Sequence, residues 1–329
     1  MATKTCFVLL GLALVFVFGA LVAKNKWREA NAAAGTLQGK WLTDPKLGIC
    51  SHRTNASEVG GDSATPSALR LLWSSGIECF DLDVVQTRDG ALLAAHPSRL
   101  QSFLSTTSPR NAGLRSDLYS HAQLKTWGAS ETAIPLLKDV AEEFSSLVRQ
   151  KLLATVGSAG SAKDSLLLLD LKGAAFSRVG VTAVAHLVKE LGIQDNTLVW
   201  VPDTHPRAAE LVEAARQAAP ELGLLQGFPD RRSGWGRTAV GDSFRAVGPV
   251  VNAPRELFAE AAARRLPAFA WLVNSRRDLL KAAEVGSRFV ISDEPVAMLR
   301  EAEASDARRR AGGGGHSARG CPQCAASVA

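Results

Sequence analysis

Cysteine is scarce in this sequence, with five residues in a chain of 329. That number is too small for the disulfide framework of a small secreted domain, whereas 46% hydrophobic residues can form a sizeable core. Cys321-Pro-Gln-Cys324 has the spacing of half a zinc site but has no second half, and we expect residues 305–329 to be a disordered Gly/Arg tail. We expect Cys50 and Cys79 to lie close together as two packed thiols rather than as a bridge.

The chain also lacks any recognised nucleic-acid-binding motif, although its formal net charge is +6. The excess positive charge is spread along the sequence, with local concentrations only at 231–237 and 308–310. A spread-out charge without a binding motif does not indicate a nucleic-acid partner, and we expect none.

One long apolar run is present, at residues 6–23, between Lys4 and Lys24. It is just long enough to span a bilayer as a helix, and no small-x-small cleavage site closes it. We therefore predict a signal anchor at 1–23, with a cleaved signal peptide as the alternative, and a spacer at 24–45. This predicts a single-pass membrane protein of the secretory pathway or endomembranes, or else a secreted one. Positive charge on both flanks leaves the orientation open.

From Leu47 onward, short apolar strands alternate with amphipathic helices. This alternation predicts parallel strands, and eight such units predict closure into an α/β fold, the (β/α)8 TIM barrel, over residues 46–304. The interval 97–164 is too long for one connection, so we predict an insertion between strands two and three. It follows an apolar stretch, 91–95, which should run beside strand two. The eight predicted strands are 47–53, 77–86, 165–172, 196–202, 222–228, 247–252, 268–274 and 288–293.

Acidic residues stand near the ends of two of these strands. Asp81 and Asp83 should point to one face because side chains alternate along a strand, and the same holds for Asp170 and Lys172. A carboxylate in a leucine-rich strand is costly unless it lies at a polar mouth beside a cation. Asp-x-Asp alone is common on solvated strand edges. Because barrel enzymes keep their chemistry at the carboxyl ends of strands, we predict that the three aspartates bind Mg²⁺ or Ca²⁺.

Two histidines stand at the ends of predicted strands, in His52-Arg53 and at His96. Together with a cation they suit cleavage of a phosphodiester, whose transition state gains negative charge on oxygen. We predict that Arg53 and Lys172 bind phosphate oxygens. Histidine transfers protons near neutral pH, so His52 and His96 are the predicted acid and base, with the assignment left open.

This ordered set resembles the glycerophosphodiester phosphodiesterase family, within the phospholipase C-like phosphodiesterase superfamily, over about residues 47–300. The family has His-Arg after its first strand, an acidic-x-Asp pair on its second and a histidine fifteen residues after the first acid. Here these are His52-Arg53, Asp81-Leu82-Asp83 and His96. Its later motifs resemble Asp170-Leu171-Lys172, Trp271-Leu272-Val273-Asn274 and Ser292-Asp293-Glu294-Pro295.

The resemblance implies a TIM barrel that hydrolyses glycerophosphodiesters or lysophospholipids to an alcohol and a phosphomonoester, with help from a divalent cation. In that superfamily a substrate hydroxyl is thought to attack first, through a cyclic phosphate. Trp271 is then a possible pocket residue, although a core tryptophan is an equal alternative. Asn55-Ala56-Ser57 is the one glycosylation sequon, and we expect it to be unused because a glycan there would obstruct the site.

Several departures from the family pattern keep other functions open. Thr54 stands where the family has glycine, and Ala64-Thr65-Pro66 stands where it has Glu-Asn-Thr. The Asp170-Leu171-Lys172 triplet and Asn55 are also similar to spider-venom sphingomyelinase D, a lyase that forms a cyclic phosphate. A lyase of that kind is therefore one alternative. A catalytically silent, membrane-tethered barrel used for binding is another.

Overall fold

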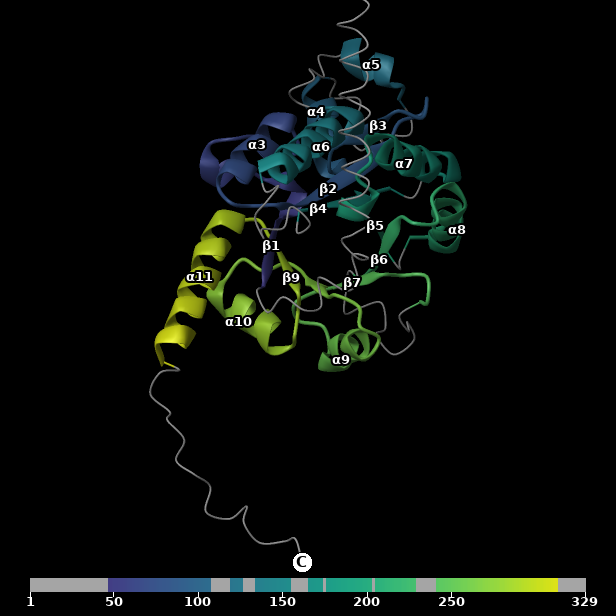
Figure 1. Ribbon diagram of the computed structural model, residues 1–329. Helices are drawn as coiled ribbons and strands as arrows, with labels where there is room; N and C mark the ends of the chain where they lie inside the picture. The colour runs from purple at the N-terminus through teal and green to yellow at the C-terminus, as the bar shows by residue number, and fades with distance from the viewer. Residues whose placement is uncertain are drawn as a thin grey trace, which may run out of the picture.

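A computed structural model describes residues 47–107, 119–126, 134–154, 165–173, 176–202, 205–228 and 241–312 (Figure 1). The predicted anchor and spacer, and the Cys321/Cys324 pair, lie outside these residues. In the part of the chain that is described, no helix is both long and apolar enough to cross a bilayer.

Eight parallel strands of the described residues form a nearly closed barrel, in the order β7-β6-β5-β4-β2-β1-β9-β8. Backbone hydrogen bonds join the two ends of this order, from Trp271 N to Pro249 O at 3.0 Å and from Val251 N to Trp271 O at 2.6 Å. Each predicted strand has its counterpart, so the architecture fits the predicted TIM barrel. The strands are β1 Gly48–Ser51, β2 Cys79–Gln86, β4 Leu166–Leu171, β5 Thr197–Pro202, β6 Gly223–Phe228, β7 Ala246–Pro249, β8 Phe269–Ala270 and β9 Phe289–Ser292.

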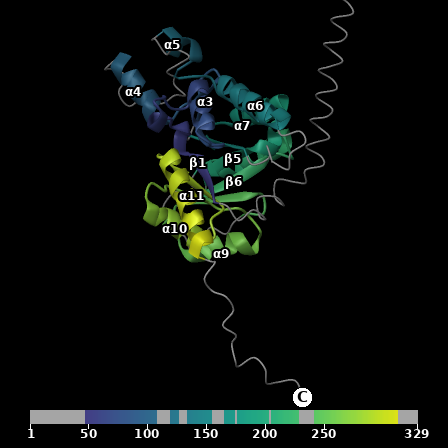
Figure 2. The same ribbon diagram turned by 60° about the vertical axis from the view of Figure 1, so that its left-hand side comes forward.

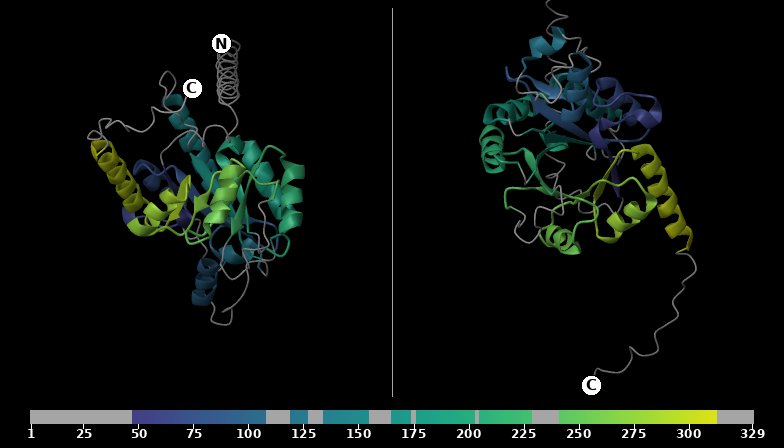
Figure 3. Two further views of the ribbon diagram at one scale, coloured as in Figure 1. Left: turned by 90° about the horizontal axis from the view of Figure 1, so that it is seen from below. Right: turned by 180° about the vertical axis from the view of Figure 1, so that it is seen from behind.

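Helices cover the outside of the barrel (Figures 1 and 3). Side chains cap the starts of some of them: the Thr65 and Ser177 hydroxyls accept hydrogen bonds from Ala68 N at 3.1 Å and Gly180 N at 3.2 Å. The helices are α3 Pro66–Ser74, α4 Pro97–Thr107, α5 His121–Thr126, α6 Leu137–Ala154, α7 Arg178–Leu191, α8 Ala208–Ala218, α9 Arg255–Ala263, α10 Arg276–Glu284 and α11 Pro295–Gly312.

The predicted insertion holds α4, α5 and α6, and Figure 2 shows α4 and α5 beyond α3 at one side of the molecule. It follows β3, Leu92–Ala94, which pairs antiparallel with β2 and confirms the strand expected before His96. At the other end, α11 runs to Gly312. The prediction of a disordered tail from residue 305 was wrong for 305–312, because this Ala- and Arg-rich segment continues the helix.

Two apolar layers lie on either side of the barrel wall. Alternate residues of β2, such as Phe80 and Leu82, pack outward in the layer beneath the helices, whereas Cys79 belongs to a separate cluster. This second cluster fills the barrel interior below the carboxyl ends of the strands. It contains Cys50, Cys79, Leu166, Leu168, Leu198, Trp200, Leu225, Ala246, Phe269, Phe289 and Ile291.

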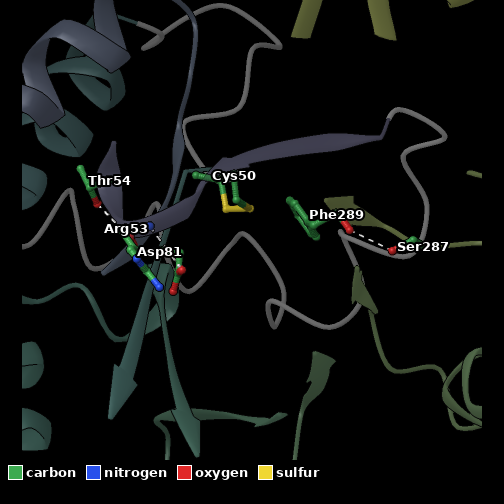
Figure 4. Close-up of a disulfide and its surroundings, with 7 residues drawn as sticks. Cys50, Arg53, Thr54, Asp81, Ser287 and Phe289 are labelled. Atoms are coloured by element: carbon green, nitrogen blue, oxygen red, sulfur yellow. Dashed lines mark hydrogen bonds between the residues drawn. A yellow bond between two sulfur atoms is a disulfide. The ribbon is translucent and has the colours of Figure 1, made fainter. Parts of the chain in front are cut away.

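Within the interior cluster, Cys50 and Cys79 form a disulfide bond (Figure 4). The two residues are register partners on β1 and β2, with Cα atoms 4.3 Å apart, so no side chain separates their sulfurs. Their proximity was predicted correctly. The expectation of two packed thiols was wrong.

Candidate active site

The three predicted acidic ligands lie together inside the barrel, above the interior cluster. Asp83 on β2 and Asp170 on β4 are register partners, and Asp81 precedes Asp83 on the same face. Asp81, Asp83 and Asp170 are buried, with exposed fractions of 3%, 2% and 5%. Two adjacent strands therefore bring three carboxylates into one buried layer.

Each of these carboxylates has one buried oxygen without a hydrogen-bond partner: Asp81 Oδ1, Asp83 Oδ2 and Asp170 Oδ1. A buried, unpartnered carboxylate oxygen costs several kcal/mol. Hard oxygen donors of this kind are the ligands that Mg²⁺ and Ca²⁺ prefer, so the residues fit a divalent cation in their chemistry. Among the described residues, no group of three His, Cys, Asp or Glu side chains is placed so that it could hold a metal ion as it stands. The carboxylates would have to close around the ion.

Lys172 lies among the acids. Its ammonium group contacts Asp170 Oδ2 directly and lies 3.3 Å from Asp83 Oδ1. Burial lowers the pKa of Lys172, but the attraction of Asp170 and Asp83 outweighs burial, so the net shift is upward. The lysine therefore stays charged and partly neutralises the cluster.

The negative charge of the cluster exceeds what Lys172 balances. Burial, together with repulsion from Asp83 and Asp170, raises the pKa of Asp81 well above its ordinary value. Burial and the repulsion of Asp83 raise the pKa of Asp170 to about 6, against the opposing effect of Lys172. A divalent cation would remove this excess and keep all three carboxylates ionised.

His52 and Arg53 are presented by a short turn, His52–Thr54, that directly follows β1. Arg53 and Thr54 have φ values of 56° and 48°, a left-handed conformation that costs a non-glycine residue about 1–2 kcal/mol. The turn is fastened to Asp81: Arg53 N donates to Oδ2 at 3.4 Å and Thr54 Oγ1 to the backbone O at 3.0 Å (Figure 4). Arg53 Nε lies 3.6 Å from Asp83 Oδ2. The structure thus brings Arg53 to the acids, as the sequence predicted.

Asp293 is a site residue that the sequence reasoning missed. Its Oδ1 lies 2.6 Å from His52 Nδ1, and its Oδ2 accepts a hydrogen bond from Asn274 Nδ2 at 2.7 Å. Asn274 Oδ1 in turn accepts from Asp293 N at 2.8 Å, which fixes the carboxylate. Both residues belong to matched motifs but were given no role. The available signal was that Asp293 directly follows a barrel strand, at its carboxyl end.

The pair of His52 and Asp293 has a defined charge state. Burial raises the pKa of Asp293, but the hydrogen bonds from His52 and Asn274 outweigh it and the net shift is downward. Burial lowers the pKa of His52, although Asp293 opposes this. Near neutral pH the arrangement is therefore a carboxylate accepting from a neutral imidazole at Nδ1, which leaves Nε2 able to accept a proton.

His96 stands between β3 and α4. Its Nδ1 accepts a hydrogen bond from Ser98 N at 3.2 Å and lies 2.6 Å from Ser98 Oγ. Burial lowers the pKa of His96, with Asp83 opposing and Arg53, Lys172 and His52 reinforcing the shift. The amide of Ala95, the residue directly before His96, donates to Asp83 O at 3.0 Å, which places His96 beside the acidic cluster. The two predicted histidines are thus brought to the same site.

Trp271 is half-buried at the end of β8. Its Nε1 donates to Gly248 O at 2.8 Å, and its ring packs edge-on against Trp200 with centroids 5.7 Å apart. Trp200 is the register partner of Asp170. Trp271 therefore packs against the interior cluster and remains partly exposed. This environment agrees both with a pocket residue and with a core tryptophan, the two predicted roles.

Asn55, in the glycosylation sequon, also reaches this region. Its Nδ2 donates to Asp293 O at 3.2 Å. A glycan attached to that nitrogen would compete with this contact beside His52. That the sequon is unused remains a prediction.

Among known protein families, no family model matches the chain. It is 30% identical over 148 residues to glycerophosphodiester phosphodiesterase GDPD4 of Arabidopsis thaliana, covering 40% of this chain and 41% of that relative. The sequence therefore resembles the glycerophosphodiester phosphodiesterases, as predicted. The matched region spans about two fifths of that relative's length.

Solved structures share the fold over most of the chain. An Oleispira antarctica phosphodiesterase in complex with the product sn-glycerol-3-phosphate is 18% identical, with a TM-score of 0.59, covering 78% of this chain and 97% of its own. A glycerophosphodiester phosphodiesterase from Parabacteroides distasonis is 13% identical, also with a TM-score of 0.59, covering 79% of this chain and 98% of its own. At these identities the likeness establishes the TIM-barrel fold.

Proposed function

We propose that this protein is a metal-dependent phosphodiesterase that hydrolyses glycerophosphodiesters to an alcohol and a phosphomonoester. One observation carries the proposal: Asp81, Asp83 and Asp170 each keep a buried oxygen without a hydrogen-bond partner, at the barrel end where His52 and His96 also lie. The names of the sequence relative and of the solved structures support the same reaction. Lysophospholipids are the second candidate class of substrate.

A Mg²⁺ or Ca²⁺ ion held by the three aspartates would supply Lewis-acid stabilisation of the phosphoryl oxygens. The remaining work falls to side chains of this chain. The Arg53 guanidinium, with its planar set of donors, binds and orients a non-bridging oxygen. Lys172 adds a fixed positive charge beside Asp170, where it balances the charge of the bound phosphate and the acids.

The hydrogen bonds of the two histidines favour an assignment of their roles. His52 is the base, because Asp293 holds its Nδ1 at 2.6 Å and stabilises the imidazolium that forms when Nε2 accepts a proton. His96 is the acid: Ser98 occupies its Nδ1, so Nε2 gives its proton to the leaving oxygen from the minor imidazolium form, in which Nδ1 donates to the Ser98 hydroxyl 2.6 Å away. In the later hydrolytic step the two roles reverse.

The predicted location in the secretory pathway or endomembranes, with residues 6–23 as anchor, remains a proposal. The Cys50–Cys79 disulfide supports it, because disulfides form and persist mainly in oxidising compartments. The anchor would keep the barrel near phospholipid-derived substrates.

The direct test incubates the full-length protein with glycerophosphocholine or lysophosphatidylcholine in Mg²⁺, Ca²⁺ or EDTA, followed by phosphorus-31 NMR. We expect an open phosphomonoester as the final product and loss of turnover in EDTA. Chelator-insensitive turnover would contradict the metal-dependent mechanism. A cyclic phosphate that accumulates would favour the sphingomyelinase D-like lyase, and no turnover under any condition would favour the silent barrel.

A further inference from the structure

The site is built across the boundary between β1 and β2, where the backbone pairing is short. β1 and β2 share two register pairs, whereas β2 and β4 share six. His52 and Arg53 come from the β1 side of this boundary, and Asp81 and Asp83 come from β2. The relative position of imidazole and carboxylates therefore depends on a short ladder.

The disulfide lies at this boundary, directly below the site. Cys50 precedes His52 by two residues, and Cys79 precedes Asp81 by two. Cys50 and Cys79 are themselves one of the two register pairs. The bond thus fixes β1 against β2 two residues before His52 on one strand and Asp81 on the other (Figure 4).

The turn above the disulfide is one that favours glycine. Arg53 and Thr54 both have positive φ, and Thr54 stands where the resemblance leads one to expect glycine. Two hydrogen bonds fasten Arg53 and Thr54 to Asp81 on β2, while Ala64 N donates to Thr54 O at 3.2 Å and Asp293 Oδ1 lies 2.6 Å from His52 Nδ1. The bonds of Arg53 and Thr54 to Asp81 loosen if β2 shifts against β1.

We propose that the Cys50–Cys79 disulfide is a positioning device for catalysis: it locks β1 to β2 so that the strained His52–Thr54 turn holds His52 and Arg53 against Asp81 and Asp83. In its effect on turnover this inference rests on the proposed function. Cys50 and Cys79 are 0% and 3% exposed, so the bond is protected from thiol exchange while the protein is folded. The device is structural and permanent.

A cycle of variants tests the proposal: Cys50→Ala/Cys79→Ala, Thr54→Gly, and the triple variant. Without the bond, kcat should fall roughly 10- to 100-fold with little change in KM, because small misplacements of catalytic groups act on the chemical step. Thr54→Gly relieves the strain of the left-handed turn but removes the Thr54 Oγ1 bond to Asp81, so it should lower kcat more in the unbridged protein than in the bridged one, because the disulfide and this bond fasten the same two strands. Cys50→Ala/Cys79→Val, which replaces lost volume, is the second choice if the first pair does not fold.

Leu211→Ala is the matched control for stability. Leu211, on the inner face of α8, is fully buried in the outer layer and is remote from the turn in sequence and layer. This variant should lower Tm while leaving kcat near the wild-type value at a temperature where all variants are folded. An unbridged protein that loses Tm but keeps its kcat, as Leu211→Ala does, would overturn the proposal.

A readout independent of turnover separates this inference from the proposed function. Amide hydrogen exchange of the peptide covering residues 52–56 should speed up in the unbridged protein, more than in Leu211→Ala, and further in the triple variant, which also lacks the Thr54 bond to Asp81. If the wild-type protein hydrolyses no glycerophosphodiester, the proposed function fails while this comparison still decides the positioning role. Unchanged exchange at 52–56 in the unbridged protein would refute the positioning role. Free thiols at Cys50 and Cys79, detected by alkylating the wild-type protein after unfolding it without a reductant, would also refute it.

Discussion

The two sides of the barrel mouth differ in chemistry. On the side of β1, β2 and β4 stand the histidine and arginine of the turn, the aspartates and Lys172. The side of β5 to β8 presents rings, with Trp200 on β5 and Trp271 at the end of β8. The barrel thus places its titratable and charged groups on one side of the mouth and its aromatic groups on the other.

The two sides are also held in place by different forces. The charged side depends on strand register, since Asp83 and Asp170 meet only because β2 and β4 pair at those residues. The aromatic side depends on fitted packing: a Cβ added at Gly248 would lie 2.8 Å from Trp200 Cζ2, so glycine there leaves room for the ring. On the proposed function, a register error would abolish turnover, whereas a packing change would alter the fit of the substrate.

The largest expected effect comes from the charged side. His52→Ala and His96→Ala should each lower kcat by about 100- to 10,000-fold, because each removes a proton-transfer group. Steady-state kinetics with glycerophosphocholine measures the change, and circular dichroism verifies that the variants are folded. His186→Ala, at an exposed position on α7, is the matched control and should match the wild type. Retained activity in one of the two site variants would remove that residue from the mechanism.

A smaller effect on the same side concerns pH and the metal-free protein. The folded-state pKa of Asp170 is about 6, above its ordinary value of 3.8. The folded protein thus binds this proton more tightly than the unfolded chain. The resulting stability is fully present below about pH 4 and is lost as pH rises through about 6.

In EDTA, this group should make the wild-type protein lose about 2 kcal/mol of unfolding free energy between about pH 4.5 and pH 7.5. Urea unfolding at the two pH values measures it, with Asp170→Asn as the variant that lacks the titrating group. Mg²⁺ or Ca²⁺ should restore stability at neutral pH in the wild type and less so in the variant. Equal pH dependence in both proteins would contradict the account of a charge excess in the cluster.

Features set by local sequence patterns could be predicted in this fold, whereas contacts between distant parts of the chain could not. Strand positions and the shared face of Asp81 and Asp83 could be predicted, because alternation and parallel pairing are written locally. The His52–Asp293 contact joins residues 241 positions apart, and no local pattern announces it. Cysteine spacing likewise indicated proximity but not the bond. Helix α11 is longer than predicted because residues 305–312 contain good helix formers but no apolar period that would identify them as helical.

The smallest effect should come from the aromatic side, and it tests directly whether the two sides of the barrel mouth have different roles. Trp271→Leu should raise KM for glycerophosphocholine by about two- to fivefold with kcat nearly unchanged, because a ring at a partly exposed site contributes about 0.5–1 kcal/mol to binding a quaternary ammonium. Trp271→Phe keeps a ring and should fall between the two. A substrate with an uncharged alcohol in place of choline should respond less. If Trp271→Leu lowered kcat as strongly as the histidine variants, the ring would belong with the reacting groups, and the division of the mouth into a chemical side and a shape side would fail.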